Sequence, residues 1–419
     1  MISESIPTTM RALILEGAGW ENLHIKTLPV PIPNENQLLA KVDCAGVCTS
    51  LLKIIQQGPN HPLMYGRDLK NNPVILGDEG SITLVKVGAQ LKKDYQIGER
   101  YVIQPAVYSS PIYEIETYSN MGQGIYKLGS GYTLPGQLAE YILITEEEIA
   151  AKCLIKVPRE DIPYSHAALT ETLSCCVSAQ ERHVHHITDD LIERRKIIRG
   201  LLPKGVLVIV GAGMMGRMNL DVAMSQPVRS VIVSEPIDSR LKMVSLLFAE
   251  RAKKRGINFK LVNPKAENLL EVVLSETEGR GADDVIVAVG NKVAIETSQQ
   301  LLGPGGTLNI FGGLPKKDSH VTLDSYSIHY LETTVVGSSG GIPWDMKYVM
   351  DLIANEDMNP ALHITNVADL NHVPELLRLM SENKLAGKAI VYPHYRTTEI
   401  HYVQNWTREK ERDYLNNRK

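Results

Sequence analysis

The chain has 419 residues, of which 43% are hydrophobic and 22% charged, and its formal net charge is −4. This length suffices for two domains with separate cores, and the charge gives no electrostatic attraction to nucleic acid or an anionic membrane surface. The opening sequence MISESIPTTM lacks the apolar core of a signal peptide, and no run approaches the ~20 apolar residues of a membrane span, so we expect a globular cytoplasmic protein.

The first third of the chain predicts short strands. Residues 10–25 predict two strands around a glycine-containing turn, and a proline-rich connector follows. A strand over 38–44 leads through AGVC into a helix over 49–56. Further strands are predicted at 82–87, 100–103 and 137–144. Strands with irregular connections are typical of a β-barrel-like domain.

Residues 106–135 predict a loop-like segment rich in tyrosine. We favour a tyrosine-stabilised surface lobe over a substrate lid. The tyrosines are Tyr108, Tyr113, Tyr118, Tyr126 and Tyr132.

The pattern becomes helical from Thr170 and then alternates between strands and helices, which predicts a parallel sheet. Short strands return over 330–340 and 384–392, so we expect the C-terminal segment to complete the first domain. The predicted domains are 1–180 completed by 330–395, then 181–329, and a charged tail, 396–419, that is solvated or docked on a partner subunit. Residues 407–415 of this tail can form a helix. The strands of the parallel sheet are predicted at 206–210, 230–235, 259–263, 284–289 and 306–311.

The sequence GAGMMG directly follows the first of these strands and predicts a dinucleotide site. Gly211 permits a tight turn, Gly213 lets a pyrophosphate approach the backbone, and Gly216 lets the helix pack closely on the strand. Met214 and Met215 begin the helix, whose N-terminus favours phosphate.

An acidic residue at the end of the next strand bears on the choice of cofactor. Glu235 follows Gly216 by 19 residues, where a carboxylate meets the adenosine ribose hydroxyls. It favours NAD over NADP, and the nearby Arg240 leaves NADP open.

Candidate chemical groups also lie outside the glycine turn. These candidates are Cys48, the pair Asp78-Glu79 in LGDEGS, and Glu171 in LTETLSCC. Taken alone, such a cysteine is more often a buried thiol without a chemical role, and such acids are more often solvated. Two groups are weaker candidates. The histidines of the charged connector RHVHHITDD could be metal ligands. Two basic residues before the acidic pair could bind phosphate, but a surface-loop role is favoured for them. These are His183, His185, His186, Arg67 and Lys70.

The five cysteines exclude some kinds of site. They are odd in number and lack repeated CxxC spacing, which argues against a disulfide framework or a four-cysteine zinc site. They are Cys44, Cys48, Cys153, Cys175 and Cys176.

Five segments of the chain, taken in order, resemble the successive signatures of the zinc-dependent medium-chain dehydrogenase/reductase family. They are AGVCTSLLK, NPVILGDEG, LTETLSCC, VLVIVGAGMMG and LLGPGGTLNIFGG. The resemblance spans Met10 to Tyr392. Within the family, the chain is most similar to the polyol and sugar-phosphate dehydrogenases, including the sorbose 1-phosphate reductase group. The features that carry this narrower resemblance are CxS followed by Lys53, the segment NPVILG before the Asp78 turn, and IHYLETTVVGSSGG.

This resemblance implies an α/β protein with a GroES-like, mainly β catalytic domain and a doubly wound Rossmann domain. It makes Cys48 a thiolate ligand of zinc and Glu171 the third ligand position. Asp78 stands where the family has the histidine of Gly-His-Glu, and Glu79 is a ligand or supports one. An anionic oxygen in place of imidazole weakens the Lewis acidity of the metal and could favour a harder ion such as Mn²⁺.

The family's structural zinc needs four closely spaced cysteines, and none lies between Tyr101 and Leu134. We therefore expect one catalytic zinc and no structural zinc. The resemblance also assigns Ser50 as the first hydroxyl of a proton relay. Lys53 is either the outer base of that relay or a solvent-facing lysine.

The activity implied is a reversible, metal-assisted hydride transfer between NAD(P)(H) and a secondary alcohol or ketone of a polyol or sugar phosphate. The alternatives are a zinc-free reductase of the same fold and a non-catalytic nucleotide-sensing protein. The family likeness also implies a homo-oligomer, a dimer or tetramer, formed through edge strands around residues 306–313. No nucleic-acid or membrane partner is expected.

Overall fold

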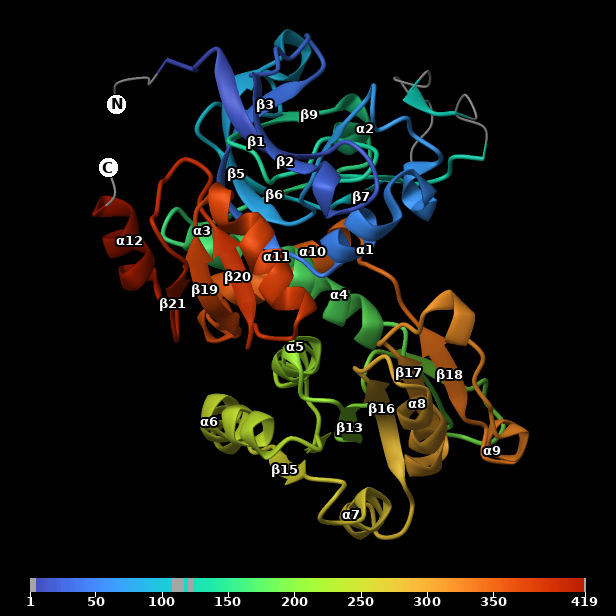
Figure 1. Ribbon diagram of the computed structural model, residues 1–419. Coiled ribbons are helices and arrows are strands. Elements are labelled where there is room, and N and C mark those ends of the chain that lie inside the picture. The colour runs from blue at the N-terminus through green and yellow to red at the C-terminus, as the bar shows by residue number, and fades with distance from the viewer. Residues whose placement is uncertain (1–4, 108–116, 120–123, 418–419) are drawn as a thin grey trace. The chain divides into compact units, whose positions relative to one another are not determined.

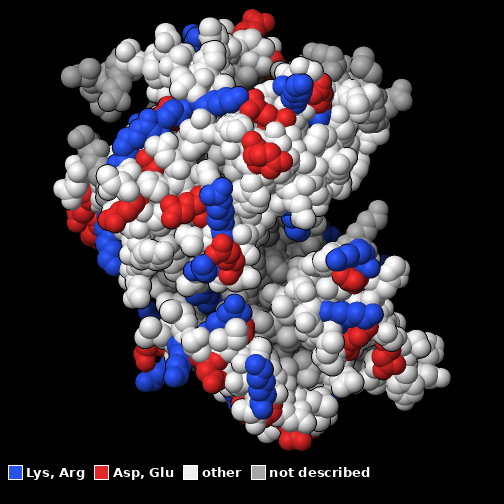
Figure 2. Space-filling model, in the orientation of Figure 1, with Lys and Arg blue, Asp and Glu red and all other residues white. Residues whose placement is uncertain are grey.

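The computed structural model describes residues 5–107, 117–119 and 124–417, and these form two compact units (Figure 1). Unit 1 comprises Met1–Thr172 and Gly341–Lys419, and unit 2 comprises Leu173–Gly340. Tyr108 and Tyr113 lie outside the described residues. On the face drawn in Figure 2, basic and acidic side chains are interspersed. None of the helices in the described ranges combines the length and hydropathy needed to cross a bilayer.

Unit 1 is built around an eight-stranded sheet with β3 at its centre. Its order is β10-β6-β5-β3-β20-β19-β21, and β9 also pairs with β3. Eight of the ten positions in β3 are buried, including Leu38, Val42 and Val47, so this strand carries much of the core. The strands are β3 (Leu38–Val47), β5 (Gly80–Val87), β6 (Arg100–Ile103), β9 (Tyr141–Ile144), β10 (Leu154–Lys156), β19 (Ile364–Ala368), β20 (Lys388–Val391) and β21 (His401–Tyr402).

A second sheet of three strands, ordered β2-β1-β4, adjoins this core. The predicted pair of strands around a turn is confirmed as β1 (Thr9–Leu15) and β2 (Leu23–Pro29), and β4 (Val74–Ile75) pairs with β1. The predicted helix is confirmed as α1 (Ser50–Gln57), which buries Leu51, Ile54 and Ile55. That i, i+3, i+4 spacing places all three on one helical face.

The remaining elements of unit 1 are short or C-terminal. β20 pairs with β3, which confirms that the C-terminal segment completes this sheet. The elements are α2 (Glu146–Ala150), α3 (Tyr164–Ala168), α10 (Pro343–Ala354), α11 (Val373–Ser381), α12 (Arg408–Asn416), β7 (Ala106–Val107) and β8 (Leu128–Gly129). α4 (Thr170–Gln180) begins in unit 1 and continues into unit 2.

The predicted tail, as far as the structure describes it (396–417), is not simply solvated but packs on its own chain. The predicted helix forms as α12, and it packs on its own chain through Trp406 and Glu411, which are 5% and 4% exposed. The Glu411 carboxylate accepts hydrogen bonds from the backbone N–H groups of Tyr164 and Ser165, both at 2.8 Å, and from the Tyr392 hydroxyl at 2.7 Å. The charged composition of this segment gave no indication that one of its acids, Glu411, is buried.

We expect Glu411→Ala to lower the free energy of unfolding by about 2–4 kcal/mol, because two buried donors and one partly buried donor would lose their acceptor. Denaturant unfolding followed by circular dichroism measures the change. Glu409→Ala, which removes an exposed acid from the same helix, is the matched control and should change stability little. Equal stability of the two variants would contradict the docking role of Glu411.

Unit 2 contains a six-stranded, fully parallel sheet in the order β15-β14-β13-β16-β17-β18. α5 and α6 pack on one face, with Leu220 and Phe248 in the core, while α7 and α8 cover the other with Val273 and Ile295 (Figure 1). The elements are β13 (Val206–Val210), α5 (Met214–Ala223), β14 (Ser230–Ser234), α6 (Asp238–Lys254), β15 (Asn258–Val262), α7 (Leu269–Glu276), β16 (Ala282–Val287), α8 (Lys292–Ser298), β17 (Leu302–Ile310), α9 (Ser325–Tyr330) and β18 (Thr334–Gly337).

All five predicted parallel strands are present, but the boundary of this unit differs from the prediction. The strand expected within 330–340 is β18, which pairs with β17 in this sheet and not with the first domain. Its short sequence, TVVG, carries no signal for which sheet it joins. β17 lies between β16 and β18, so residues 306–310 present no free edge, and the proposed oligomer edge there is wrong. The free edges of the sheet are β15 and β18.

The segment RHVHHITDD, residues 182–190, was predicted to lie in a charged connector, and a hairpin begins in it instead. β11 (Val184–Ile187) pairs antiparallel with β12 (Lys196–Arg199). His183 and His185 are buried, whereas His186 is exposed. The alternation of β11 turns one histidine inward and the next outward.

Candidate metal and nucleotide sites

The ends of two paired strands bring the predicted metal ligands together in unit 1. Cys48 follows β3, while Asp78 and Glu79 precede β5, and Ala45 is paired with Gly80 between these strands. The Cys48 sulfur and one oxygen of each acid all lie within 4.8 Å of one another. Glu171, which is 8% exposed, is not part of this group, but its charge raises the pKa of Cys48.

The electrostatics of this group favour a bound cation. Burial, followed by the charge of Asp78, raises the pKa of the Cys48 thiol to about 12. Burial and the charge of Glu79 raise the pKa of Asp78 to about 6, against a hydrogen bond from Ser50. Close anionic groups in a buried site disfavour one another's charged forms, and a divalent cation reverses this effect.

The donor atoms also fit a metal ion. The Ser50 hydroxyl donates to Asp78 Oδ2 at 2.6 Å. Asp78 Oδ1 is buried and has no hydrogen-bond partner among the described residues. One sulfur with carboxylate oxygens is within the ligand range of zinc. Cys48, Asp78 and Glu79 can therefore hold the ion that the sequence pattern implies.

Glu79 is fixed by two further residues that the sequence did not reveal. It is fully buried, and its Oε1 forms an ion pair with Lys388 of β20 while its Oε2 accepts from the Thr172 hydroxyl. A Cβ at Gly46 would lie 2.6 Å from the Glu79 carboxyl carbon, so glycine is needed there. The sequence signal that could have revealed Lys388 is a lysine at the start of an otherwise apolar strand, KAIV.

Lys388 is itself fully buried. Burial alone lowers the pKa of this lysine, but the charges of Glu79 and Cys48 outweigh burial and raise the pKa above its usual range. Lys388 therefore stays cationic and offsets part of the negative charge around the metal ligands.

The two proposed relay residues lie in different surroundings. Ser50 is at the start of α1 and donates a hydrogen bond to Asp78, whereas Lys53 is exposed on the same helix. Burial and the Lys53 charge lower the pKa of His61. The His61 ring contacts Tyr132 with their centroids 5.2 Å apart.

Tyr132 is a site residue that the sequence placed only in the tyrosine-rich segment. Burial and the charges of Asp78 and Cys48 raise its pKa, whereas a hydrogen bond with Ser50 lowers it. Tyr132 thus borders the metal ligands. Arg67 instead donates to the backbone carbonyls of Asn72 and Thr133, both at 2.9 Å, which supports the loop role already favoured for it. Lys70 is exposed.

The glycine turn in unit 2 has the geometry expected of a phosphate-binding turn. Gly211 has φ +98°, which disfavours a side chain, and a Cβ at Gly216 would lie 1.9 Å from the Gly211 carbonyl oxygen. α5 begins at Met214 with Gly213 as its N-cap, so the N–H groups of its first turn, including that of Met215, are oriented to bind phosphate.

A cavity of about 540 Å³ adjoins this turn and is lined by Gly211, Glu235 and Arg240. Glu235 follows β14 and is 2% exposed. Its Oε2 accepts from the Ala212 N–H at 2.9 Å and pairs with Arg240 at 3.5 Å. The turn and the acid predicted from spacing therefore lie at one cavity.

Comparison with known proteins bears on both units. The family model of the alcohol dehydrogenase GroES-like domain matches residues 34–158, and that of the zinc-binding dehydrogenases matches residues 215–355. The chain is 30% identical to mannitol-1-phosphate 5-dehydrogenase of Aliivibrio fischeri over 381 residues, which cover 90% of this chain and 85% of that relative. It is 27% identical to L-sorbose 1-phosphate reductase of Klebsiella pneumoniae, covering 89% and 86%.

The fold is similar to that of solved alcohol dehydrogenases. The structure of 2R,3R-butanediol dehydrogenase from Bacillus subtilis matches with a TM-score of 0.71 at 19% identity, covering 92% of this chain and 100% of that one. This similarity confirms the predicted fold class, a mainly β GroES-like part with a doubly wound nucleotide-binding part.

Proposed function

The chain belongs to the zinc-binding, GroES-like alcohol dehydrogenases, and we propose that its substrate is a polyol or a sugar phosphate. It is an NAD(P)-dependent oxidoreductase. The observation that carries the substrate class is its similarity to mannitol-1-phosphate 5-dehydrogenase and L-sorbose 1-phosphate reductase over most of the length of each. Both relatives are named for phosphorylated six-carbon substrates.

Cys48 and Asp78, with Glu79 or Glu171, would hold the metal. A bound zinc ion supplies Lewis acidity, which stabilises an alkoxide or polarises a carbonyl. Glu79 is held by Lys388 and Thr172, so we assign it mainly to balancing and orienting this group, with Glu171 as the other candidate carboxylate ligand. The cofactor supplies the hydride chemistry, and the protein aligns the reacting atoms.

The proton of the substrate hydroxyl needs a path to solvent. Asp78 Oδ2 accepts from Ser50, which orients that hydroxyl as the first relay group. Lys53 is solvated on the same helix, a position from which it can exchange protons with water. Tyr132 forms a hydrogen bond with Ser50 and so borders this relay.

The experiment that tests the function is a dehydrogenase screen over polyols, polyol phosphates, ketose phosphates and inositols with NAD and NADP. We expect kcat/KM to be highest on a phosphorylated polyol or its ketose. Full activity in EDTA with no bound metal would favour a zinc-free reductase. No turnover of any substrate by metal-loaded, cofactor-binding protein would favour a nucleotide sensor.

We also propose that NAD is preferred over NADP. The carboxylate of Glu235 would accept hydrogen bonds from the adenosine ribose hydroxyls and repel a 2′-phosphate. We expect Glu235→Ala to lower kcat/KM for NAD by about 10- to 100-fold, the effect of losing charge-assisted hydrogen bonds. The same change should affect NADP less. Glu250→Ala, an exposed acid on α6, is the control. Equal losses for both cofactors would argue against this role of Glu235.

We further propose that the protein is a homo-oligomer. The free edge β18 is one place where a second copy could extend the parallel sheet. Sedimentation equilibrium of the full chain measures the state.

A further inference from the structure

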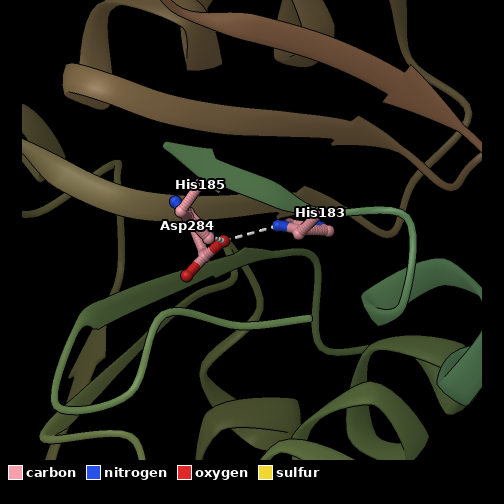
Figure 3. A group of neighbouring side chains, drawn as sticks. All are labelled: His183, His185 and Asp284. Carbon is pink, nitrogen blue, oxygen red and sulfur yellow. Dashed lines mark hydrogen bonds and ion pairs between the residues drawn. The ribbon is translucent and has the colours of Figure 1, made fainter. Parts of the chain in front are cut away.

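Two histidines and an aspartate form a buried cluster in unit 2 (Figure 3). His183 precedes β11 and His185 lies within it, whereas Asp284 lies in β16, about a hundred residues further along the chain. Their exposed fractions are 0%, 4% and 1%. One ligand atom from each residue lies within 4.8 Å of the other two.

Both imidazoles approach the same carboxylate oxygen. His183 Nδ1 lies 2.6 Å from Asp284 Oδ1, and His185 Nε2 lies 3.0 Å from it. Asp284 Oδ2 accepts the Leu202 N–H at 2.9 Å, which fixes the carboxyl plane. Burial raises the pKa of Asp284, but its contacts with the two histidines outweigh burial and lower the pKa to about 2. The group is therefore a carboxylate and accepts hydrogen bonds only.

The geometry of the two imidazoles suits a bound cation. Nδ1 of His183 and Nε2 of His185 both face one oxygen of the Asp284 carboxylate. A positive charge, either a proton added to an imidazole or a metal ion, would stabilise this arrangement.

We propose that this charge is a divalent transition-metal ion such as Zn²⁺, bound by His183, His185 and Asp284. Two imidazole nitrogens and one carboxylate oxygen are a donor set that suits zinc, and a water molecule can complete a tetrahedron.

The ion would tie the β11–β12 hairpin to the parallel sheet. Apart from the cluster, the Thr307 hydroxyl of β17 donates to the Val184 carbonyl oxygen at 3.2 Å. The residues that line the nucleotide cavity include none of the three ligands. The role is therefore structural, and the metal-binding free energy contributes to folding. The proposal does not depend on the substrate or on catalysis in unit 1.

The test removes the metal site of unit 1 and counts the ions that remain. The full chain carrying Cys48→Ser and Asp78→Asn is purified, stripped with chelator, loaded with Zn²⁺ or Co²⁺, dialysed and measured by mass spectrometry of the metal. We expect one ion per chain in this background variant and two in the unchanged chain. Co²⁺ in the background variant should show d–d absorption without the sulfur charge-transfer band that a thiolate gives.

Adding Asp284→Asn to the background variant should abolish the remaining ion. Asp283→Asn is the matched control, because this neighbouring carboxylate is also buried and accepts a backbone N–H, that of Val206 at 2.8 Å, but is not part of the group of possible metal ligands among the described residues. It should retain one ion. His185→Gln provides a second variant if Asp284→Asn does not fold, and circular dichroism verifies folding.

Chelation supplies an independent readout on the folded background variant. EDTA should lower its Tm by several degrees and leave the Tm of the His185→Gln derivative unchanged. Fewer than about 0.1 ion per folded background chain would overturn the proposal and assign the charge to a proton on His185. Equal metal content in the Asp284→Asn and Asp283→Asn derivatives would overturn it as well.

Discussion

Cys48→Ser should lower kcat/KM by about 10³-fold or more and remove the metal from unit 1. Lewis-acid stabilisation is worth several kcal/mol, and each 1.36 kcal/mol changes a rate tenfold. The serine hydroxyl is far less acidic than a thiol and does not replace the thiolate ligand. The remaining acids would then repel one another without a cation, since the charge of Glu79 already raises the pKa of Asp78.

The measurement pairs steady-state kinetics on the best substrate of the screen with metal analysis. Cys44→Ala is the matched control, because Cys44 is a buried thiol on the same strand, β3, but lies outside the group of metal ligands. It should keep its metal and most of its activity. If Cys48→Ser instead retains full activity, the reaction does not use this metal, and the zinc-free alternative is supported.

The elements that are formed by contacts between residues close together in the sequence were the easiest to predict. The glycine turn, its strand and its helix depend on contacts within a few residues, so Gly211, Gly213 and Gly216 could be interpreted from spacing alone. Cys48 and the Asp78-Glu79 pair were predicted from the resemblance, and the antiparallel pairing of β3 with β5 is what brings them together.

Residues that join the site from distant parts of the chain were not predictable. Lys388 reaches Glu79 across 309 residues of sequence, and a single lysine before AIV indicates neither its strand partner nor its burial. Tyr132 was one of several tyrosines in a segment without periodic pattern. The burial of Glu411 was not predicted because a charged stretch favours a solvated interpretation, although this acid accepts hydrogen bonds from three donors, two of them buried.

Lys388→Met should lower the free energy of unfolding by about 3–5 kcal/mol, the usual cost of breaking a buried ion pair by removing one partner. Glu79 would remain fully buried beside Cys48 and Asp78, with the Thr172 hydroxyl still donating to its carboxylate but without the positive charge of Lys388. Saturating Zn²⁺ should reduce the deficit, because the ion supplies positive charge to the same group of ligands.

The double variant Lys388→Met/Glu79→Gln separates loss of charge balance from loss of packing. Neutralising both partners removes the unpaired charge, so we expect it to recover most of the stability that the single variant loses, as measured by denaturant unfolding of the metal-free chain. Lys384→Met, which breaks an exposed pair with Glu382, should change stability little. If the single and double variants are equally unstable, Lys388 acts by filling space, and the charge of this site must be balanced by the metal ion alone.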